Sequence, residues 1–483
     1  MTALRVPQKS ANLKPMTLPA EFIEAATGLL GDNGYSRDPE HLNAAATPWR
    51  GTYSGSTPFL AMPNSTEQVS ALMKLCQQHK VCVTPQGGNT GLVDAGTPHG
   101  EITLSLRRMQ TIRDVDPFNN SLTIEAGAPL IKAQQAAEDT NRLFPLSLGS
   151  EGTATIGGLI STNAGGVAVL RYGMMRDLLL GLEVVLANGE IWSGLSGLRK
   201  NNTGYDLKHV FAGAEGTLGI ITAATLKLYP KTGRATAWIT CPSARAVVEL
   251  LALVRDHAGD TVTSFEIIPA EAVDLVVAGE ATIRDPNPSN QPWRVLCEVS
   301  MPKEEQARVL LEDALAAAFE AELASDALVA ENMRQAKDFW TIRETIPLSK
   351  RAYGTAINHD ISVPISKIPE FLAAAEKRLS QAFPGATLIA FGHVGDGNLH
   401  YSVCESPDMP GDRLHSAADE ITETVHDLTR SFGGSISAEH GVGRLKRDEL
   451  AETRPQAATQ AMIAIKRALD PEGLLNPGRV VRA

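Results

Sequence analysis

The chain has 483 residues, of which 43% are hydrophobic and 20% charged, and its length predicts roughly two to three globular domains. The formal net charge of −11 disfavours a nucleic-acid partner, because affinity for a polyphosphate comes mainly from Lys and Arg. The five cysteines lack C-x-x-C spacing, which argues against a disulfide framework or a thiolate metal site. No apolar run is long enough to span a membrane, and the N-terminus has polar residues and prolines where a signal peptide needs an apolar segment. We therefore expect a cytoplasmic protein without a membrane span.

The beginning of the chain predicts an arm followed by alternating helices and strands. Residues 1–44 contain one short helical stretch and are expected to form an N-terminal arm. A helix begins after Ser65, where S-T-E-Q has the spacing of a capping box, and it leads into a strand at 81–84. Apolar runs at 102–106 and 122–126 predict two further strands.

The middle of the chain contains a predicted hairpin and a predicted domain boundary. Asn188-Gly189 suits the positive φ angles of a type I′ turn, so 178–193 is expected to form a β-hairpin. A strand at 219–228 ends at Tyr229-Pro230, and longer helices follow, which places the boundary near residue 232. Later helices are expected at 244–257, 303–323, 369–383 and 457–469, and strands at 295–299 and 356–363. The expected parts are the arm at 1–44, a first domain at 45–232, an α+β second domain at 233–433 and a C-terminal segment at 434–483.

Three segments of the first domain combine glycine with small polar residues: 86–92, 149–166 and 213–221. Glycine lets the backbone approach a ligand closely, and successive free amide N–H groups form a concavity that suits a pyrophosphate. Three such loops favour a dinucleotide site, although each one alone is more often a tight turn. None has the spacing of a Rossmann fingerprint or a P-loop, so neither of those sites is supported.

The second domain contains a pair of histidines that a turn should bring together. Residues 388–403 predict two strands around a Gly-Asp-Gly turn, with His393 just before it and His400 just after it. Further along, Glu439 and His440 offer a carboxylate and a third imidazole on a glycine-flanked loop. Two histidines and one carboxylate leave open positions on zinc, iron or manganese, as catalytic metal sites require. Spacing alone leaves open that these histidines are polar residues satisfied by local hydrogen bonds.

The glycine-rich segments also resemble those of a known family. PQGGNTGL, TIGGLISTNAGG, KNNTGYDL and AGAEGTLGIIT are similar, in order and interval, to the FAD-binding segments of the vanillyl-alcohol oxidase and p-cresol methylhydroxylase flavoproteins. From about residue 45 onward, the chain resembles the FAD-linked branch that contains D-lactate dehydrogenase, the glycolate oxidase catalytic subunit and D-2-hydroxyglutarate dehydrogenase. The resemblance implies an α/β (α+β) fold: a two-subdomain FAD-binding domain of the p-cresol methylhydroxylase type, an α+β substrate domain, and a C-terminal segment that returns to the flavin domain.

The same resemblance implies which residues bind FAD. The first glycine-rich loop would wrap the pyrophosphate, the second would line the flavin and the third would hold the adenosine side. The expected cofactor-binding residues are Pro85, Gln86, Gly87, Gly88, Asn89, Thr90, Gly91, Gly152, Thr155, Gly158, Asn163, Glu215, Gly216, Gly219, Ile221 and Asn476. Some relatives tether the flavin to a histidine where this chain has Asn89, so FAD is expected to bind without a covalent link.

The resemblance extends to the histidine segments. GHVGDGNLH and SAEHGVG match family segments in which His393, His400 and Glu439 would bind a divalent metal, zinc first of all, and His440 would be the catalytic base. Oxidising a 2-hydroxy acid removes a proton from oxygen and a hydride from carbon, and a flavin accepts only the hydride directly. A metal bound by the substrate carboxylate and hydroxyl would lower the pKa of the hydroxyl, and a histidine can accept its proton near neutral pH.

Further positions concern the substrate. Arg343 matches the family's W-x-x-R-E pattern and would bind a substrate carboxylate, although such an arginine is more often a surface helix residue paired with an acid. Asn398 and His440 would also contact substrate, and stabilising its own turn is at least as strong a role for Asn398. Pro347 and Asn358 stand where D-2-hydroxyglutarate dehydrogenases have a threonine or serine and a lysine. Losing that lysine removes a cation, so we expect D-lactate or bulkier monocarboxylates to be preferred.

The sequence thus predicts an FAD-dependent D-2-hydroxyacid dehydrogenase of EC class 1.1. A homodimer is expected, with an electron-transfer flavoprotein or a quinone as electron acceptor. One alternative is a D-2-hydroxyglutarate or D-malate dehydrogenase of the same branch. Another is an alcohol or phenol flavin oxidase of the same fold, which would not need the metal. Two alternatives come from other classes of protein. A metal-dependent hydrolase could use the same histidines and glutamate but would not need the glycine-rich loops. A non-catalytic flavin-binding protein would need neither the metal nor the base.

Overall fold

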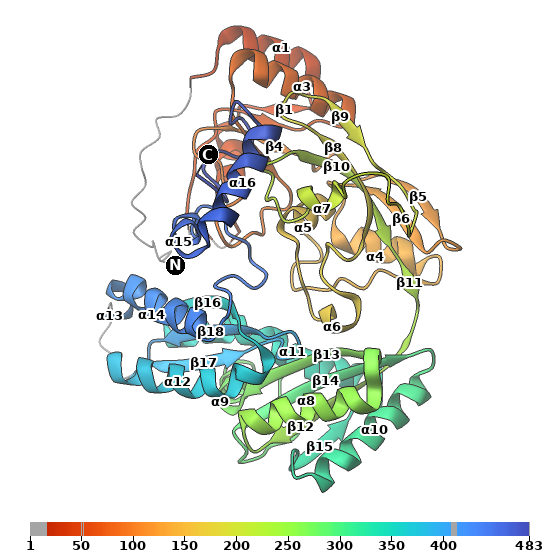
Figure 1. The fold of residues 1–483 in the computed structure, drawn as a ribbon, viewed down its shortest axis with the longest axis vertical. Helices are drawn as coiled ribbons and strands as arrows, with labels where there is room; N and C mark the ends of the chain where they lie inside the picture. Colours follow the sequence, from red (N-terminus) through yellow and green to blue (C-terminus); the bar gives the residue numbers. More distant parts are fainter. Residues whose placement is uncertain (1–16, 50, 52, 407–412, 483) are drawn as a thin grey trace. The chain divides into compact units, whose positions relative to one another are not determined.

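The protein divides into two compact units, and each is described by itself. The computed structural model describes residues 17–49, 51, 53–406 and 413–482, so the start of the expected N-terminal arm lies outside the described part (Figure 1). The first unit is Met1–Gly165, Met174–Pro230 and Glu439–Ala483, and the second is Gly166–Gly173 and Lys231–Ala438. The chain passes from the first unit to the second between residues 230 and 231, and it returns to the first unit between residues 438 and 439. The sequence predicts these two boundaries near 232 and 433. The sequence also assigns 166–173 to the first domain, whereas this short piece belongs to the second unit.

The first sheet of the first unit includes part of the expected arm. Its strand order is β1-β2-β4-β3, with bounds Tyr35–Ser36, Leu60–Ala61, Ile102–Ser105 and Val83–Gln86. Its helices are α1 (Ala20–Leu30), α2 (Pro39–Ala46) and α3 (Thr66–His79), and α1 packs against α3. Ser65 caps α3 by accepting from Gln68 N at 3.2 Å, as the capping-box spacing predicts. Because β1 pairs with β2, the arm is a structural part of this unit.

The second sheet of the first unit is antiparallel, in the order β5-β6-β10-β8-β9. The strands are Ile112–Asp116, Ser121–Glu125, Ile220–Lys227, Leu179–Val185 and Ile191–Ser193. Helices α4 (Leu130–Glu138), α5 (Ile156–Thr162) and α7 (Lys208–Phe211) belong to the same unit, and β7 (Arg142–Leu143) pairs with β11 (Tyr229–Pro230). The strands predicted from their apolar runs are thus confirmed within a few residues.

The hairpin of β8 and β9 is confirmed, but its turn type is not I′. Gly189 has a φ of 80°, whereas Asn188 is not among the residues with positive φ. Gly189 N donates to Leu186 O at 2.9 Å, and Leu186 N donates to Glu190 O at 2.9 Å, which makes a three-residue loop ending in a glycine bulge. The Asn188 side chain accepts from Glu190 N at 3.0 Å, a local hydrogen bond that favours this alternative turn.

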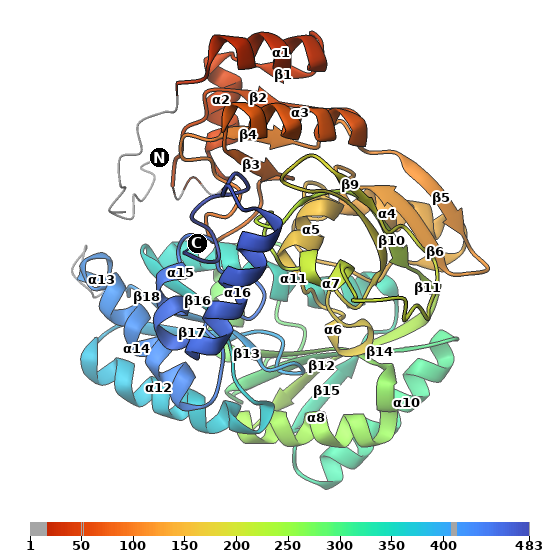
Figure 2. The ribbon, with the colours of Figure 1, turned by 45° about the horizontal axis from the view of Figure 1, so that its top comes forward.

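The C-terminal segment completes the first unit. It contains α15 (Arg447–Thr453) and α16 (Gln456–Leu469), drawn in blue in Figures 1 and 2. After α16 the backbone pairs with β3: Val83 N donates to Leu474 O and Asn476 N donates to Val83 O, both at 2.8 Å. The expected return of this segment to the first domain is therefore confirmed.

The larger sheet of the second unit lies between two pairs of helices. Its strands β13-β14-β12-β15 are Val262–Pro269, Trp293–Met301, Gly233–Cys241 and Asp326–Val329, all paired antiparallel. The helices are α8 (Ala244–Ala258), α9 (Ala270–Gly279), α10 (Glu304–Glu320) and α11 (Met333–Ser349). Alternate residues of a strand face opposite sides. Ala237 and Ile239 accordingly share one apolar core with α8 and α10, while Trp238 shares another with α9 and α11.

The smaller sheet, β16-β18-β17, has one apolar face and one face that mixes polar and apolar residues. Its strands are Ala356–Ser362, Asn398–Cys404 and Thr387–Phe391, and its helices are α12 (Ile368–Ala382), α13 (Arg413–Ser416) and α14 (Ala418–Ser431). Leu399, Tyr401 and Val403 join the apolar core that includes α12 and α14, so Asn398, His400 and Ser402 point to the opposite face. The antiparallel pairing of β17 with β18 confirms the predicted hairpin.

One more helix completes the second unit. The short helix α6 (Val169–Tyr172), from the 166–173 piece, packs on β13, and Ser264 Oγ donates to Val167 O at 2.5 Å. This contact explains why the piece leaves the first unit. Among the described residues, no helix combines the length and the apolar character needed to cross a membrane.

Candidate active site

The three glycine-rich segments meet in the first unit. A Cβ on Gly87 would overlap Thr155 Oγ1, and one on Gly88 would overlap a carbonyl oxygen of the second segment, so the first two segments are in direct contact. A Cβ on Gly216 would lie 3.2 Å from the Pro85 ring, which brings the third segment against the first. Glycine is required at Gly87 and Gly88 because no side chain fits. Together the three segments form one cluster of closely approaching backbone, a glycine cradle, at the place where the sequence predicts a dinucleotide site.

Several of the expected cofactor residues have a backbone conformation that is rare outside glycine. Positive φ angles occur at Asn89 (53°), Asn163 (50°), Glu215 (50°) and Asn476 (44°). Such conformations concentrate at functional sites, where the surroundings hold them in place. The Asn89 side chain donates to Thr47 O at 3.0 Å, and Asn163 Oδ1 accepts from Arg176 N at 2.9 Å. Backbone geometry thus singles out positions that the family resemblance also selects.

The other expected cofactor residues have varied surroundings. Gln86 is buried, and its Nε2 donates to two backbone carbonyls at 2.8 and 2.9 Å. Thr155 caps α5 by accepting from Gly158 N at 3.4 Å. Ile221 is buried in β10, and Gly219 packs against Val184 and Phe211. Gly91 and Gly152 have open space beside them, and Thr90 lies half-buried between Asn89 and Gly91. Their contacts with FAD stay predictions.

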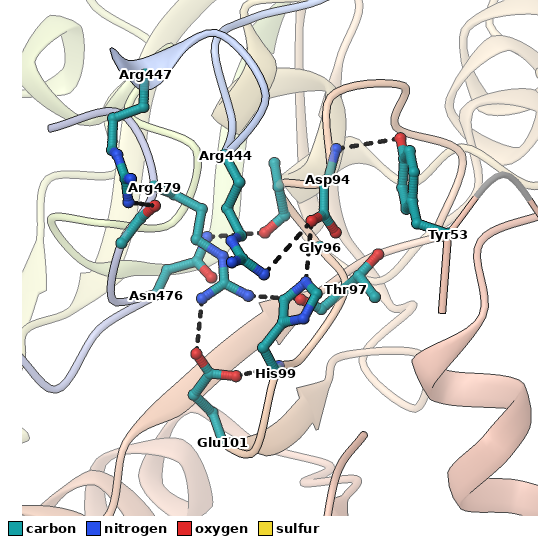
Figure 3. A network of polar contacts seen from close by, with 12 residues as sticks. Tyr53, Asp94, Gly96, Thr97, His99, Glu101, Arg444, Arg447, Asn476 and Arg479 are labelled. Carbon is teal, nitrogen blue, oxygen red and sulfur yellow. Dashed lines mark hydrogen bonds and ion pairs between the residues drawn. The ribbon is translucent and has the colours of Figure 1, made fainter. Parts of the chain in front are cut away.

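A polar network joins the loop after the first glycine-rich segment to the C-terminal segment (Figure 3). The buried Asp94 carboxylate lies 2.9 Å from His99 Nε2 and 3.8 Å from Arg444 Nη1. Arg479, also buried, donates to Glu101 Oε1 at 2.7 Å. Burial alone would raise the pKa of Glu101, but the Arg479 guanidinium holds that pKa below its usual value. The network anchors the C-terminal segment on the loop that follows the first glycine-rich segment.

Asn476 lies beside Arg479 in the same region (Figure 3). Its Nδ2 donates to Ala95 O at 3.0 Å and to Glu215 O at 2.7 Å, so it links the loop after the first segment to the third segment. Asn476 is 1% exposed, and its Oδ1 has no hydrogen-bond partner among the described residues. Buried polar atoms are normally satisfied, so this acceptor fits a donor from a bound group.

Glu215 also holds the loop 439–443. Its buried carboxylate accepts from the backbone N–H groups of Val442 and Gly443, each at 2.8 Å. A Cβ on Gly441 would lie 2.8 Å from Glu215 Oε1, so the loop backbone runs directly over the carboxylate. Burial raises the pKa of Glu215, and the two amide donors act in the opposite direction. The carboxylate thereby fixes the backbone immediately after the expected base.

Glu439 and His440 begin the C-terminal part of the first unit. His440 Nε2 lies 4.0 Å from Glu439 Oε1. Glu439 directly follows Ala438, the last residue of the second unit, and Ala438 N donates to Asp360 O at 3.3 Å within that unit.

His393, in the second unit, contacts a carboxylate and a guanidinium. Its Nδ1 lies 2.5 Å from Glu266 Oε1, and Arg343 Nε donates to Glu266 Oε2 at 2.7 Å. Arg343 Nη2 lies 3.3 Å from His393 Nε2, so a tautomer with the proton on Nδ1 satisfies both contacts. Burial alone would raise the pKa of Glu266, but His393 and Arg343 hold it at about 2. Ile267 and Gly392 form a backbone bridge, and this bridge holds their chain neighbours Glu266 and His393 side by side.

His400 and Asp360 face each other across β18 and β16. His400 Nδ1 lies 3.9 Å from Asp360 Oδ1. Asn398 Nδ2 donates to Asp360 Oδ1 and to Ile361 O, both at 2.9 Å, so this amide ties the hairpin to β16. The rings of His393 and His400 have centroids 5.5 Å apart, which confirms that the hairpin brings the two imidazoles together.

Sequence reasoning missed three buried charged residues: Glu266, Asp360 and Lys350. Glu266 has a recognisable signal, because it is the single charge in the otherwise apolar or hydroxylic strand VTSFEIIP. A lone acid in a buried strand needs a partner. Asp360 and Lys350 carry no comparable local signal.

Comparison with protein families defines the class of protein. A model described as an FAD binding domain matches residues 57–194, and one described as FAD linked oxidases, C-terminal domain, matches residues 231–480. Together with the glycine cradle, these matches define a flavoprotein oxidoreductase. The chain belongs to the FAD-linked oxidase family.

Individual relatives cover most of the chain. It is 35% identical to the mitochondrial D-2-hydroxyglutarate dehydrogenase of Arabidopsis thaliana, covering 94% of this chain and 80% of that protein. It is 33% identical to a D-2-hydroxyglutarate dehydrogenase of Stutzerimonas stutzeri, covering 97% of this chain and 100% of that protein.

Solved structures confirm the predicted fold. A p-cresol methylhydroxylase with substrate bound has a TM-score of 0.74 at 19% identity, covering 95% of this chain and 96% of the other. An alkyldihydroxyacetonephosphate synthase has a TM-score of 0.74 at 17% identity, covering 99% of this chain and 89% of the other. At these identities the likeness concerns the fold alone.

Proposed function

We propose that this chain oxidises a D-2-hydroxy acid to the corresponding 2-oxo acid with FAD as cofactor. The observation that carries the proposal is the presence, in one chain of the FAD-linked oxidase family, of a glycine cradle and a carboxylate-oriented histidine pair. A cradle alone fits any flavoprotein, whereas the histidine pair meets the additional demand of activating a hydroxyl group. Relatives named D-2-hydroxyglutarate dehydrogenase support the D configuration.

FAD fits the residues of the first unit. The glycine-rich segments approach one another closely at Gly87 and Gly88, and the unpartnered Oδ1 of Asn476 offers a buried acceptor to a bound group. Asn89 carries no nucleophile, which supports binding without a covalent link. When bound, FAD supplies the acceptor for the hydride removed from the substrate carbon.

A divalent metal, zinc first of all, is proposed to be held by His393, His400 and Glu439. Glu266 supports this assignment, because a metal-binding histidine commonly donates its other ring N–H to a carboxylate. His393 Nε2 then keeps the lone pair that Arg343 Nη2 contacts in this structure, and a metal would take the place of that contact. Asp360, opposite His400, adds a further carboxylate to the donor set. When bound, such an ion would lower the pKa of the substrate hydroxyl.

The remaining steps are assigned to side chains of this protein. His440 accepts the hydroxyl proton, and its backbone is held by the contacts of Glu215 with the next residues. Arg343 binds the substrate carboxylate, and its ion pair with Glu266 keeps the guanidinium in a fixed orientation. An electron-transfer flavoprotein or a quinone as electron acceptor, a homodimer and a cytoplasmic location complete the proposal.

Anaerobic flavin bleaching tests this function. Purified protein loaded with FAD should lose its oxidised flavin absorbance with one or more D-2-hydroxy acids and keep it with the L enantiomers. Removing metal with a chelator should slow bleaching at least tenfold without releasing FAD, and adding zinc should restore the rate. Protein that gains no flavin absorbance after incubation with FAD would refute the flavoenzyme proposal. Full activity after verified metal removal would refute the metal assignment and favour an alcohol or phenol oxidase.

A further inference from the structure

The loop 93–97 joins the first glycine-rich segment to the C-terminal segment. It follows closely after Gly91, and Gln86 Nε2 donates to Gly96 O at 2.9 Å, so it is tied to the first segment at both ends. Its carbonyls at 93, 95 and 97 accept hydrogen bonds from the C-terminal segment. The donors are Arg444 N, Asn476 Nδ2 and Arg479 Nη2. Restraining the first segment therefore also restrains this loop, which we call the connector loop.

Asp94, in the connector loop, combines a strained backbone with a buried charge. Its φ is 59°, a left-handed value that is uncommon outside glycine, and its side chain is 0% exposed. Its Oδ2 lies 2.9 Å from His99 Nε2 and 3.8 Å from Arg444 Nη1 (Figure 3). Its Oδ1 has no hydrogen-bond partner among the described residues. Such a carboxylate is costly to bury, and strained residues concentrate at functional sites, so Asp94 needs a reason beyond stability.

Arg444, the cation of this ion pair, closely follows His440 in the chain. Its backbone N–H donates to Val93 O at 3.1 Å, so its backbone and its side chain both contact the connector loop. A Cβ on Gly443, whose φ is 53°, would overlap Val93 O, so the two backbones are in direct contact. Burial lowers the pKa of Arg444, and the Asp94 carboxylate opposes that shift. Residues 439–444, which we call the base loop, are thus attached to the connector loop by an ion pair and by their backbone.

We propose that Asp94 is a positioning residue that couples occupancy of the glycine cradle to the placement of the base loop, through its ion pair with Arg444. The inference rests on the proposed function, in which FAD binds the first glycine-rich segment and His440 is the base. Occupancy of that segment restrains the connector loop, and the connector loop then restrains Arg444 and the backbone that leads back to His440. The base is therefore held most firmly when the hydride acceptor is present.

Hydrogen exchange of backbone amides tests this coupling without any turnover. The informative amides are those of residues 442–444, which donate to Glu215 or to Val93. In wild-type protein, saturation with FAD should slow their exchange about fivefold or more relative to apoprotein. In Asp94→Asn, with FAD saturation verified by absorbance, the slowing should fall below about twofold. Asparagine has nearly the same size and tolerates the same left-handed backbone, so this variant removes the charge and keeps the conformation.

Variants of Arg444 test the other half of the ion pair. Arg444→Met should lose the slowing as Asp94→Asn does, and Arg444→Lys should keep most of it because the cation remains. Arg482→Met is the matched control, since it removes a surface ion pair with Asp448 in the same segment. In stopped-flow flavin reduction at saturating substrate, Asp94→Asn and Arg444→Met should each lower the rate roughly tenfold. The double variant should also be lowered only about tenfold, because both substitutions remove one shared contact.

A merely structural role gives a different result. It would speed exchange equally in apoprotein and in FAD-bound protein, so the slowing by FAD would be the same in Asp94→Asn as in wild type, and the coupling would be overturned. Absence of any slowing in wild type, or additive losses in the double variant, would overturn it as well. If Asp94→Asn does not fold, Arg444→Met gives the same test from the partly exposed partner. Each of these results refutes the coupling alone, whereas protein that binds no FAD would refute the proposed function itself.

Discussion

Replacing Glu215 by alanine should slow flavin reduction more than it weakens FAD binding. The carboxylate accepts two backbone N–H groups, from Val442 and Gly443, at 2.8 Å each, directly after His440. A hydrogen bond to a charged group contributes about 1.5–3 kcal/mol, so removing both withdraws on the order of 3–6 kcal/mol from the loop. Water and loop relaxation recover part of this. If about 2 kcal/mol remains, the rate of flavin reduction falls roughly 30-fold.

Stopped-flow reduction at saturating substrate measures that rate, and titration of apoprotein measures the dissociation constant of FAD. Glu215→Gln is the matched control, because its amide oxygen keeps one of the two acceptors and the fall should be smaller. Wild-type reduction rates in Glu215→Ala would refute the positioning role. A weakened FAD affinity with an unchanged reduction rate would instead support the adenosine contact that the family resemblance implies.

Two further substitutions test the cradle and the buried carboxylate. Gly87→Ala should reduce bound flavin per protein and raise the FAD dissociation constant at least fivefold, because its Cβ would overlap Thr155 Oγ1. Gly91→Ala, where nothing lies within 4 Å, is the control, and equal effects of the two would contradict the cradle. The pKa of Glu266 is about 2, below its ordinary value of 4.5, so its contribution to stability is complete above 4.5 and is lost as the pH falls towards 2. Urea unfolding between pH 5 and 2.5 should show wild type losing more stability than Glu266→Gln, by on the order of 3 kcal/mol, and parallel losses would count against the ion pair.

Local patterns were sufficient for elements whose signal is contained in a few residues. The helix expected at 244–257 is α8, and the hairpin at 388–403 is β17 and β18. The turn after β8 differs because the Asn188 side chain bonds to the backbone, and a dipeptide preference does not include that competition. The piece at 166–173 changes unit through long-range contacts with β13, which leave no composition signal at its ends.

The residues of the candidate site also fall into two groups, those that a local pattern brings together and those that only long-range strand pairing brings together. His393 and His400 could be paired from sequence because one turn joins them. Glu266 and Asp360 could not be, since each reaches a histidine through pairing between strands that are distant along the chain. Lys350 shows the limit most clearly, because its hydrogen bond to Asn358 exists only where a helix end and a strand meet in three dimensions.

The pairing of β3 with the C-terminal segment constrains how the protein can be made. Val83 bonds to residues 474 and 476, so this pairing cannot form until the ribosome has passed the entire second unit. The second unit is nearly continuous in sequence and can fold while the first still lacks its last partner. Contacts between distant residues form slowly, and domains generally fold as units during synthesis. On this order of events, FAD would enter a protein whose substrate unit is already folded, and capture of the cofactor would mark the end of folding.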